Sequence, residues 1–147
     1  MVKCDDQTWL ISYLCERIGL VPTSHIRAIG KIKEGKLIGV VGYDGWTGSA
    51  CEMHMAGEPG WLTYDFIKFA FEYPFICGDC KLVIGKIPSG NIAALDIDKR
   101  LGFKEVLVLP DAHPDGALHI LIMKREDCKW LEQRHGKEKS STSTSPT

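Results

Sequence analysis

The sequence has 147 residues, 25% of them charged, and a formal net charge of −1. A chain of this length forms one domain with a sizeable core, and its balanced charge leaves no electrostatic footprint for nucleic acid or an anionic membrane. The apolar runs are too short to span a bilayer and the first residues lack an apolar signal core, so we expect a cytoplasmic protein.

The N-terminal half is expected to form one helix and three strands. Apolar residues at helical spacing predict a helix over 6–18, which Gly19 ends. Alternating apolar and polar residues over 25–32 and 37–43, separated by a glycine-containing turn, predict a β-hairpin. A polar loop follows, and 49–55 is the next expected strand.

The C-terminal half is expected to form two helices and three strands. Residues 62–73 are apolar almost all round, which is typical of a buried helix, and Pro74 should kink or end it. The remaining expected elements are a strand over 81–87, a helix over 92–101, and strands over 105–109 and 117–123. This order predicts an α+β fold, with a mixed, mostly antiparallel sheet and helices on both faces.

The domain organisation follows from a change in composition near the C-terminus. Residues 1–131 carry all the expected elements and form a single domain. Residues 132–147 are polar, end in a run of Ser, Thr and Pro, and have nothing to bury. We therefore expect them to form a disordered tail.

Two groups of potentially reactive side chains are expected to be ordinary. The six cysteines lack a framework spacing, and Cys77 and Cys80 form half a zinc site without a second pair, so we expect reduced thiols and no metal. His113 and His119 flank an expected hairpin turn over 111–116 and are expected to be surface or edge residues.

The junction before the helix at 62–73 reads Ala-Gly-Glu-Pro-Gly, from Ala56 to Gly60. A helix start presents free N–H groups and a positive dipole, and glycine lets a ligand approach the backbone closely. The junction is therefore a candidate cradle for an anion such as phosphate. An ordinary loop is the alternative, and Glu58 counts against the cradle because a carboxylate repels phosphate.

A second segment carries a family resemblance. It begins with Asn91, continues with Ala94, and ends in Leu-Gly-Phe at 101–103. This pattern resembles the N-x-x-A … L-G-F signature of the GNAT superfamily, the acetyl-CoA-dependent N-acetyltransferases. The order of elements agrees with that superfamily over roughly 38–123. The segments 71–75, 85–91 and 125–131 are similar to a small subgroup found in bacteriophage and bacterial genomes.

The resemblance implies an architecture for binding acetyl-CoA. Two strands, at 50–55 and 81–87, would part and leave room for the pantetheine arm. The backbone of the junction would hold the pyrophosphate. The implied cofactor-binding residues are Met55, Ala56, Gly57, Gly60, Trp61, Leu62, Thr63 and Asn91. The implied activity is transfer of an acetyl group to a primary amine, on a small molecule or a protein.

Acetyl transfer by direct attack needs a base, because an alkyl amine with a pKa near ~10 is mostly charged at pH 7. Strand alternation places Glu52 and His54 on one face, and Cys51 and Met53 on the other. We expect Glu52 to be the base and His54 a relay or second candidate. The alternative is that this polar pair faces solvent. Cys51 is expected to be a buried thiol.

Departures from the family pattern favour a rival interpretation. The junction keeps one glycine of the usual cradle, lacks its basic or amide residue, and contains the bulky Trp61 and Leu62. Asp98 stands where many members carry a tyrosine proposed to protonate the departing thiolate, which a carboxylate could not do. The rival is a catalytically inactive GNAT-shaped binding or interaction module. The region before the strand at 37–43 is short, so a homodimer is expected to complete the acceptor side.

Overall fold

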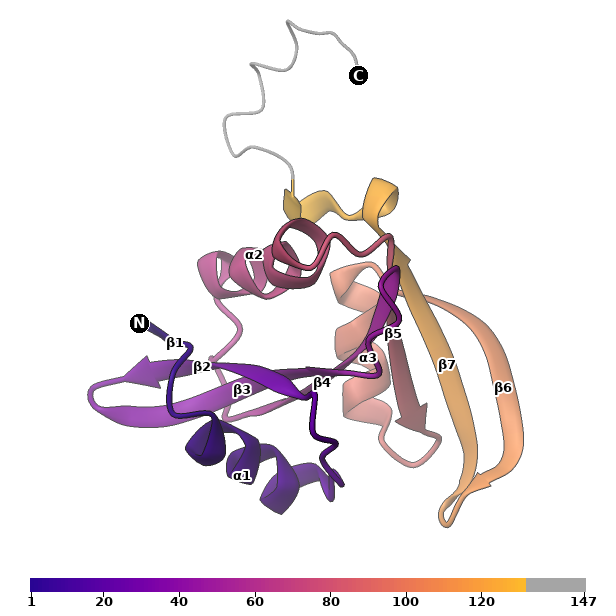
Figure 1. The fold of residues 1–147 in the computed structure, drawn as a ribbon. Helices are drawn as coiled ribbons and strands as arrows, with labels where there is room; N and C mark the ends of the chain where they lie inside the picture. The colour runs from indigo at the N-terminus through magenta and orange to yellow at the C-terminus, as the bar shows by residue number, and fades with distance from the viewer. Residues whose placement is uncertain (132–147) are drawn as a thin grey trace, which may run out of the picture.

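The computed structural model describes residues 1–131, which form one seven-stranded sheet with helices on both faces (Figure 1). The helices are α1 Gln7–Ile18, α2 Tyr64–Glu72 and α3 Ile92–Leu101. The strands are β1 Val2–Lys3, β2 Arg27–Lys33, β3 Lys36–Asp44, β4 Ala50–Gly57, β5 Leu82–Pro88, β6 Lys104–His113 and β7 Gly116–Lys124. A π-helical turn follows α2 at Tyr73–Cys77, and two 3₁₀ turns lie at Arg125–Asp127 and Lys129–Leu131. The expected tail at 132–147 lies outside the described residues.

The strand order is β1-β2-β3-β4-β5-β7-β6, and every neighbouring pair is antiparallel except β4 and β5. The predicted α+β class is therefore confirmed. Helix α1 covers one face of the sheet and α2 the other, while α3 packs against β5 (Figure 1). The sequence did not predict β1, because two residues are too few to show a pattern.

The helix boundaries were predicted best where capping residues mark them. Asp6 accepts a hydrogen bond from the Trp9 amide, and Gly19 ends α1 in the left-handed conformation at φ 66°. The Asn91 side chain accepts from the Ala94 amide at 3.1 Å, and Gly102 ends α3 at φ 115°. These contacts satisfy backbone groups that a helix end leaves without partners. Both predicted helices are confirmed.

Two expectations about the chain after the junction were wrong. Helix α2 begins at Tyr64 instead of 62 and is not buried all round, because Tyr64 and Phe69 are exposed. The α-helix ends at Glu72 and Pro74 lies in the π-helical turn that follows, which agrees with the end or kink expected at this proline. The six-residue turn expected at 111–116 is also shorter, because β6 continues to His113 through a bulge after Leu109.

Trp61 fixes the path of the chain from β4 to α2. Its indole is 6% exposed and lies flat over Gly39 of β3 and Gly57 of β4. A Cβ atom on these glycines would lie 2.0 Å and 2.3 Å from the ring, so both positions must lack a side chain. Trp61 is therefore a core residue that holds the junction against the sheet.

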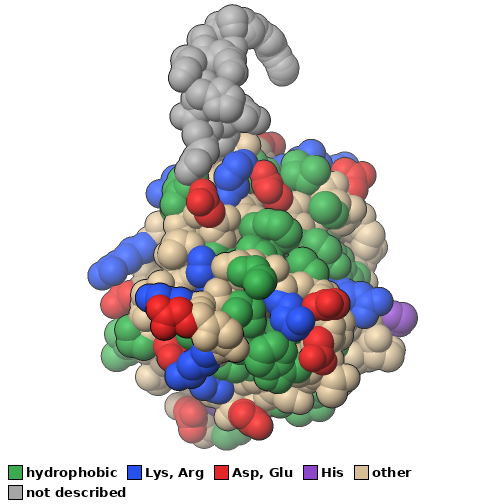
Figure 2. All heavy atoms as spheres, turned by 90° about the vertical axis from the view of Figure 1, so that its left-hand side faces the viewer, with side chains coloured by type: hydrophobic (Ala, Val, Ile, Leu, Met, Phe, Trp, Pro, Cys, Tyr) green, Lys and Arg blue, Asp and Glu red, His purple; other side chains and the backbone are tan. Residues whose placement is uncertain are grey.

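The side of the molecule nearest the β2–β3 hairpin carries charges of both signs. Figure 2 shows Lys and Arg side chains next to Asp and Glu side chains, with apolar side chains between them. Such a mixed surface does not select a polyanion, in agreement with the net charge of −1. Within residues 1–131, the helices are too short or too polar to cross a bilayer.

Candidate active site

Strands β4 and β5 lie side by side only at their beginnings. Their parallel pairing joins Ala50 to Leu82 and, at its last step, Glu52 to Ile84. Beyond that step the described strands part: β4 stays with β3 up to Gly57, and β5 stays with β7 up to Pro88. Backbone groups on the facing edges are thus left open to a ligand. The parting that the resemblance implied is present.

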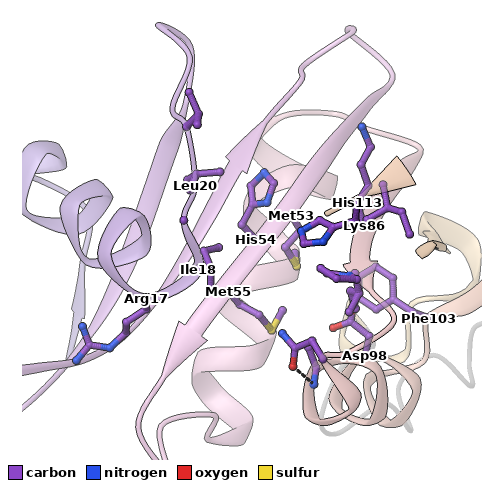
Figure 3. A pocket seen from close by; sticks show the side chains of 17 residues that line it. Arg17, Ile18, Leu20, Met53, His54, Met55, Lys86, Asp98, Phe103 and His113 are labelled. Atoms are coloured by element: carbon purple, nitrogen blue, oxygen red, sulfur yellow. Dashed lines mark hydrogen bonds between the residues drawn. The ribbon is translucent and has the colours of Figure 1, made fainter. Parts of the chain in front are cut away.

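A cavity of about 360 Å³ occupies this gap. Its walls come from the segment after α1, the second half of β4, the end of β5, and α3. In Figure 3, His54 points toward Leu20 on the α1 side, whereas Met53 and Met55 point toward α3. The cavity therefore passes between the strands and reaches both faces of the sheet.

Three of the residues predicted from the sequence line this cavity: His54, Met55 and Asn91. Asn91 caps α3 through its side-chain oxygen. The capping bond leaves the NH₂ group of the same amide as a donor. The cavity wall also contains Arg17, Leu20, Lys86 and Asp98, none of which the sequence analysis assigned to the site.

The expected base, Glu52, lies where the strands begin to part and is not on the described cavity wall. Its Oε2 atom is 3.1 Å from Nζ of Lys86, a residue of β5. This ion pair engages one of the two carboxylate oxygens that could accept a proton. The sequence could not show the pairing, because it depends on the parallel register of two distant segments.

His54, unlike Glu52, lies on the cavity wall. Burial lowers its pKa, and the positive charge of Lys86 acts in the same direction, whereas Glu52 and Asp44 raise it. Because burial is the largest effect, the ring is neutral at pH 7. A neutral imidazole on the cavity wall can accept a proton from a bound group.

The chain continues beyond the cavity-lining part of β4 toward α2. This segment carries the other predicted cofactor-binding residues, which are Ala56, Gly57, Gly60, Trp61, Leu62 and Thr63. The amides of Trp61 and Thr63 donate to Glu58 and Trp61 carbonyls at 3.1 Å and 3.0 Å. Not every amide of the junction is therefore free for an anion.

The charges around the junction differ from what its sequence suggests. Glu58 turns toward Lys36 at 3.4 Å and Arg17 at 3.9 Å, so its carboxylate is balanced by two cations. Nζ of Lys31 lies 3.1 Å from Oγ1 of Thr63, the residue that begins α2. A strand far away in the sequence thus supplies the cation that the junction lacks.

Asp98 has an environment that the sequence did not show. It lies on α3 with 6% of its surface exposed, and its Oδ2 atom faces Gly85, where a Cβ would lie 2.8 Å away. Among residues 1–131 its carboxyl group has no hydrogen-bond or ion-pair partner. Burial raises its pKa to about 7, so a large fraction is protonated at neutral pH. The sequence analysis treated Asp98 as a carboxylate, whereas its raised pKa lets it hold a proton near pH 7.

No protein-family model and no curated protein matches the sequence. Solved structures do match. A point mutant of spermidine N-acetyltransferase SpeG from Vibrio cholerae matches with a TM-score of 0.70 at 13% identity, over 89% of this chain and 95% of that one. The N-acetyltransferase PseH from Campylobacter jejuni matches with a TM-score of 0.55 at 16% identity, over 70% of both chains. The chain has the GNAT fold.

Cys51 of β4 is a buried thiol in this GNAT-fold protein. Cys51 is fully buried, and burial together with the neighbouring Cys80 raises its pKa well above the usual range. A thiol that stays protonated is a poor nucleophile. The buried position expected for Cys51 is therefore confirmed. Among residues 1–131, no three or more His, Cys, Asp or Glu side chains are grouped as a metal site requires.

Proposed function

We propose that the protein transfers an acetyl group from acetyl-CoA to a primary amine. The observation that carries this proposal is the cavity between β4 and β5, which reaches both faces of the sheet. A neutral histidine lies toward one face and a protonatable aspartic acid toward the other (Figure 3). Two substrates can therefore meet through the sheet, the amine on the α1 side and the thioester on the α3 side.

The residues present suit acetyl-CoA. The cavity volume of about 360 Å³ lies in the range of small-molecule sites. The open strand edges offer hydrogen bonds to the amides of a pantetheine arm, Met53 and Met55 give it an apolar wall, and the NH₂ group of Asn91 adds a donor. The start of α2, with Lys31 beside Thr63, would hold the diphosphate.

The proposed reaction is a direct transfer. His54 removes a proton from the ammonium group, and the neutral amine attacks the thioester carbonyl. A carbon–nitrogen bond forms, and the nitrogen of the tetrahedral intermediate gives its second proton to solvent. The carbon–sulfur bond then breaks, and Asp98 protonates the departing thiolate. Solvent then takes the proton from His54 and returns one to Asp98. Glu52, paired with Lys86, contributes a negative charge that acts on His54.

The acceptor side carries charges of both signs. The carboxylates of Asp44 and Glu52 act on His54, whereas the cations Arg17 and Lys86 line the cavity. Spermidine, the substrate named for the SpeG neighbour, is one amine to test as the acceptor. We also propose a homodimer, because only residues 19–26 link α1 to β2 on this side and a second copy would complete the wall.

The experiment that tests the function measures binding and turnover together. A ligand at a hundredfold its Kd adds about 2.7 kcal/mol to the free energy of unfolding, so CoA and acetyl-CoA should raise the melting temperature. Acetyl-CoA should then release free thiol faster when an amine from a panel that includes spermidine is present than when no amine is present. Binding without thiol release would favour the inactive binding module, and the absence of any shift would contradict the acetyltransferase.

A further inference from the structure

Three side chains that take no part in the proposed acetyl transfer form a continuous chain of hydrogen bonds. Oγ of Ser89 lies 3.0 Å from Nε2 of His119, and Nδ1 of the same ring lies 2.7 Å from Oε1 of Glu105. Ser89 follows β5, His119 belongs to β7, and Glu105 belongs to β6. The sequence analysis expected His119 to be an ordinary edge residue.

The order hydroxyl, imidazole, carboxylate is the one that activates a serine. The hydrogen bond to His119 lowers the pKa of Glu105, which stays a carboxylate and can only accept. In the neutral imidazole of His119, Nδ1 therefore carries the hydrogen and Nε2 is left as the acceptor for the Ser89 hydroxyl. A histidine held in this tautomer is a general base aimed at the serine oxygen.

The backbone around Ser89 suits a nucleophile. Ser89 lies on the turn from β5 to α3, and its amide is held by the Ala117 carbonyl at 2.9 Å. The amides of Ile92 and Ala93 belong to the first turn of α3, where N–H groups have no partner within the helix and can stabilise an oxyanion. A side chain at Gly90 would meet no described atom within 4 Å, so the backbone next to Ser89 is uncovered.

We propose that Ser89, His119 and Glu105 form a second, nucleophilic centre that hydrolyses small acyl esters or thioesters. Pro88 and Asn91, on either side of Ser89, line the cleft, so the centre lies at its rim. Ser89 and His119 are catalytic residues, and Glu105 is a positioning residue. This centre needs neither an amine nor the base and acid proposed for the cleft.

The proposed hydrolysis has two steps. Oγ of Ser89 attacks the carbonyl carbon while its proton moves to Nε2 of His119. The bond to the leaving alcohol or thiol breaks, and that group takes the proton from His119, which leaves an acyl-serine. Water then attacks the acyl-serine with His119 accepting its proton. The carboxylic acid leaves, and the proton returns to Ser89.

Labelling with an alkyl fluorophosphonate tests the centre directly. Attack by Ser89 forms an oxygen–phosphorus bond, expels fluoride and passes the serine proton to His119. We expect peptide mapping by mass spectrometry to place the adduct on Ser89, with no adduct there in Ser89→Ala. Relative to wild type, His119→Gln should slow labelling by about 100-fold or more and Glu105→Gln by about tenfold or more. Glu105→Asp should restore part of the rate, which a merely structural role would not do.

The matched control is Ser24→Ala, which removes an exposed serine outside the centre and should label like the wild type. Two assays without amine distinguish esters from thioesters as substrates. Hydrolysis of p-nitrophenyl acetate releases p-nitrophenol, and hydrolysis of acetyl-CoA releases CoA. An unlabelled Ser89 in the folded wild type would overturn the proposal, as would equal labelling of wild type and His119→Gln. Amine-dependent thiol release does not require Ser89 chemistry, so either proposal can fail while the other holds.

Discussion

Replacement of His54 by glutamine is expected to lower kcat for amine acetylation by about 10²–10⁴-fold, the usual contribution of a general base. The change keeps a polar side chain of similar reach on the cavity wall but removes the group that accepts the proton of the amine. The measurement is steady-state thiol release from acetyl-CoA with a reactive amine, recorded from pH 5 to pH 9. Because burial lowers the pKa of His54, the wild type should stay active below pH 6.5.

Two further variants separate the role of His54 from a general effect of mutation and from the role of Glu52. His25→Gln changes an exposed histidine that does not line the cavity, and its kcat should match the wild type. Glu52→Gln breaks the ion pair with Lys86 and removes a charge acting on His54, so a smaller loss is expected than for His54→Gln. A larger loss in Glu52→Gln would identify Glu52 as the base and contradict the role given to His54.

Asp98→Asn is expected to stabilise the protein increasingly as the pH rises. Burial raises the pKa of Asp98 from 3.8 in the unfolded chain to about 7 in the folded one. Between these values the folded protein holds a proton that the unfolded chain has released, so wild-type stability falls by up to about 1.4 kcal/mol per pH unit. Above pH 7 both states are ionised and the loss is constant. Asparagine does not ionise and avoids this loss.

Urea unfolding at pH 5 and pH 8 measures the effect. The free energy of unfolding of Asp98→Asn, relative to the wild type, should increase by about 2–3 kcal/mol between these two values. Asp96→Asn, which changes an exposed aspartate on the same helix, should show no such increase. A pH-independent difference for Asp98→Asn would show that this carboxyl has an ordinary pKa. The role of Asp98 as the acid would then fail as well.

The parts of the structure that the sequence predicted are those decided by local chemistry. Asn91 and Gly102 mark the two ends of α3, so its bounds could be read directly. The β2–β3 hairpin followed from alternation around Glu34-Gly35, both of which have positive φ. In each case the deciding contacts join residues that are close in the sequence.

The parts that the sequence did not predict depend on contacts between distant segments. From the sequence, Trp61 was interpreted as an obstacle to the cofactor. In the structure its ring packs over Gly39 and Gly57 of the sheet. Asp98 acquires its raised pKa only because α3 buries it against the core and its carboxyl against Gly85. Such pairings follow from strand register and helix packing, which no local pattern encodes.

The central claim is that a CoA thioester lies in the gap between β4 and β5. A crystal structure of the protein grown with CoA tests it most directly. The account predicts density for the pantetheine arm between the strands beyond Glu52 and Ile84, with the diphosphate near Thr63 and Lys31. CoA bound elsewhere, or β4 and β5 paired along their whole length with the cavity closed, would contradict it.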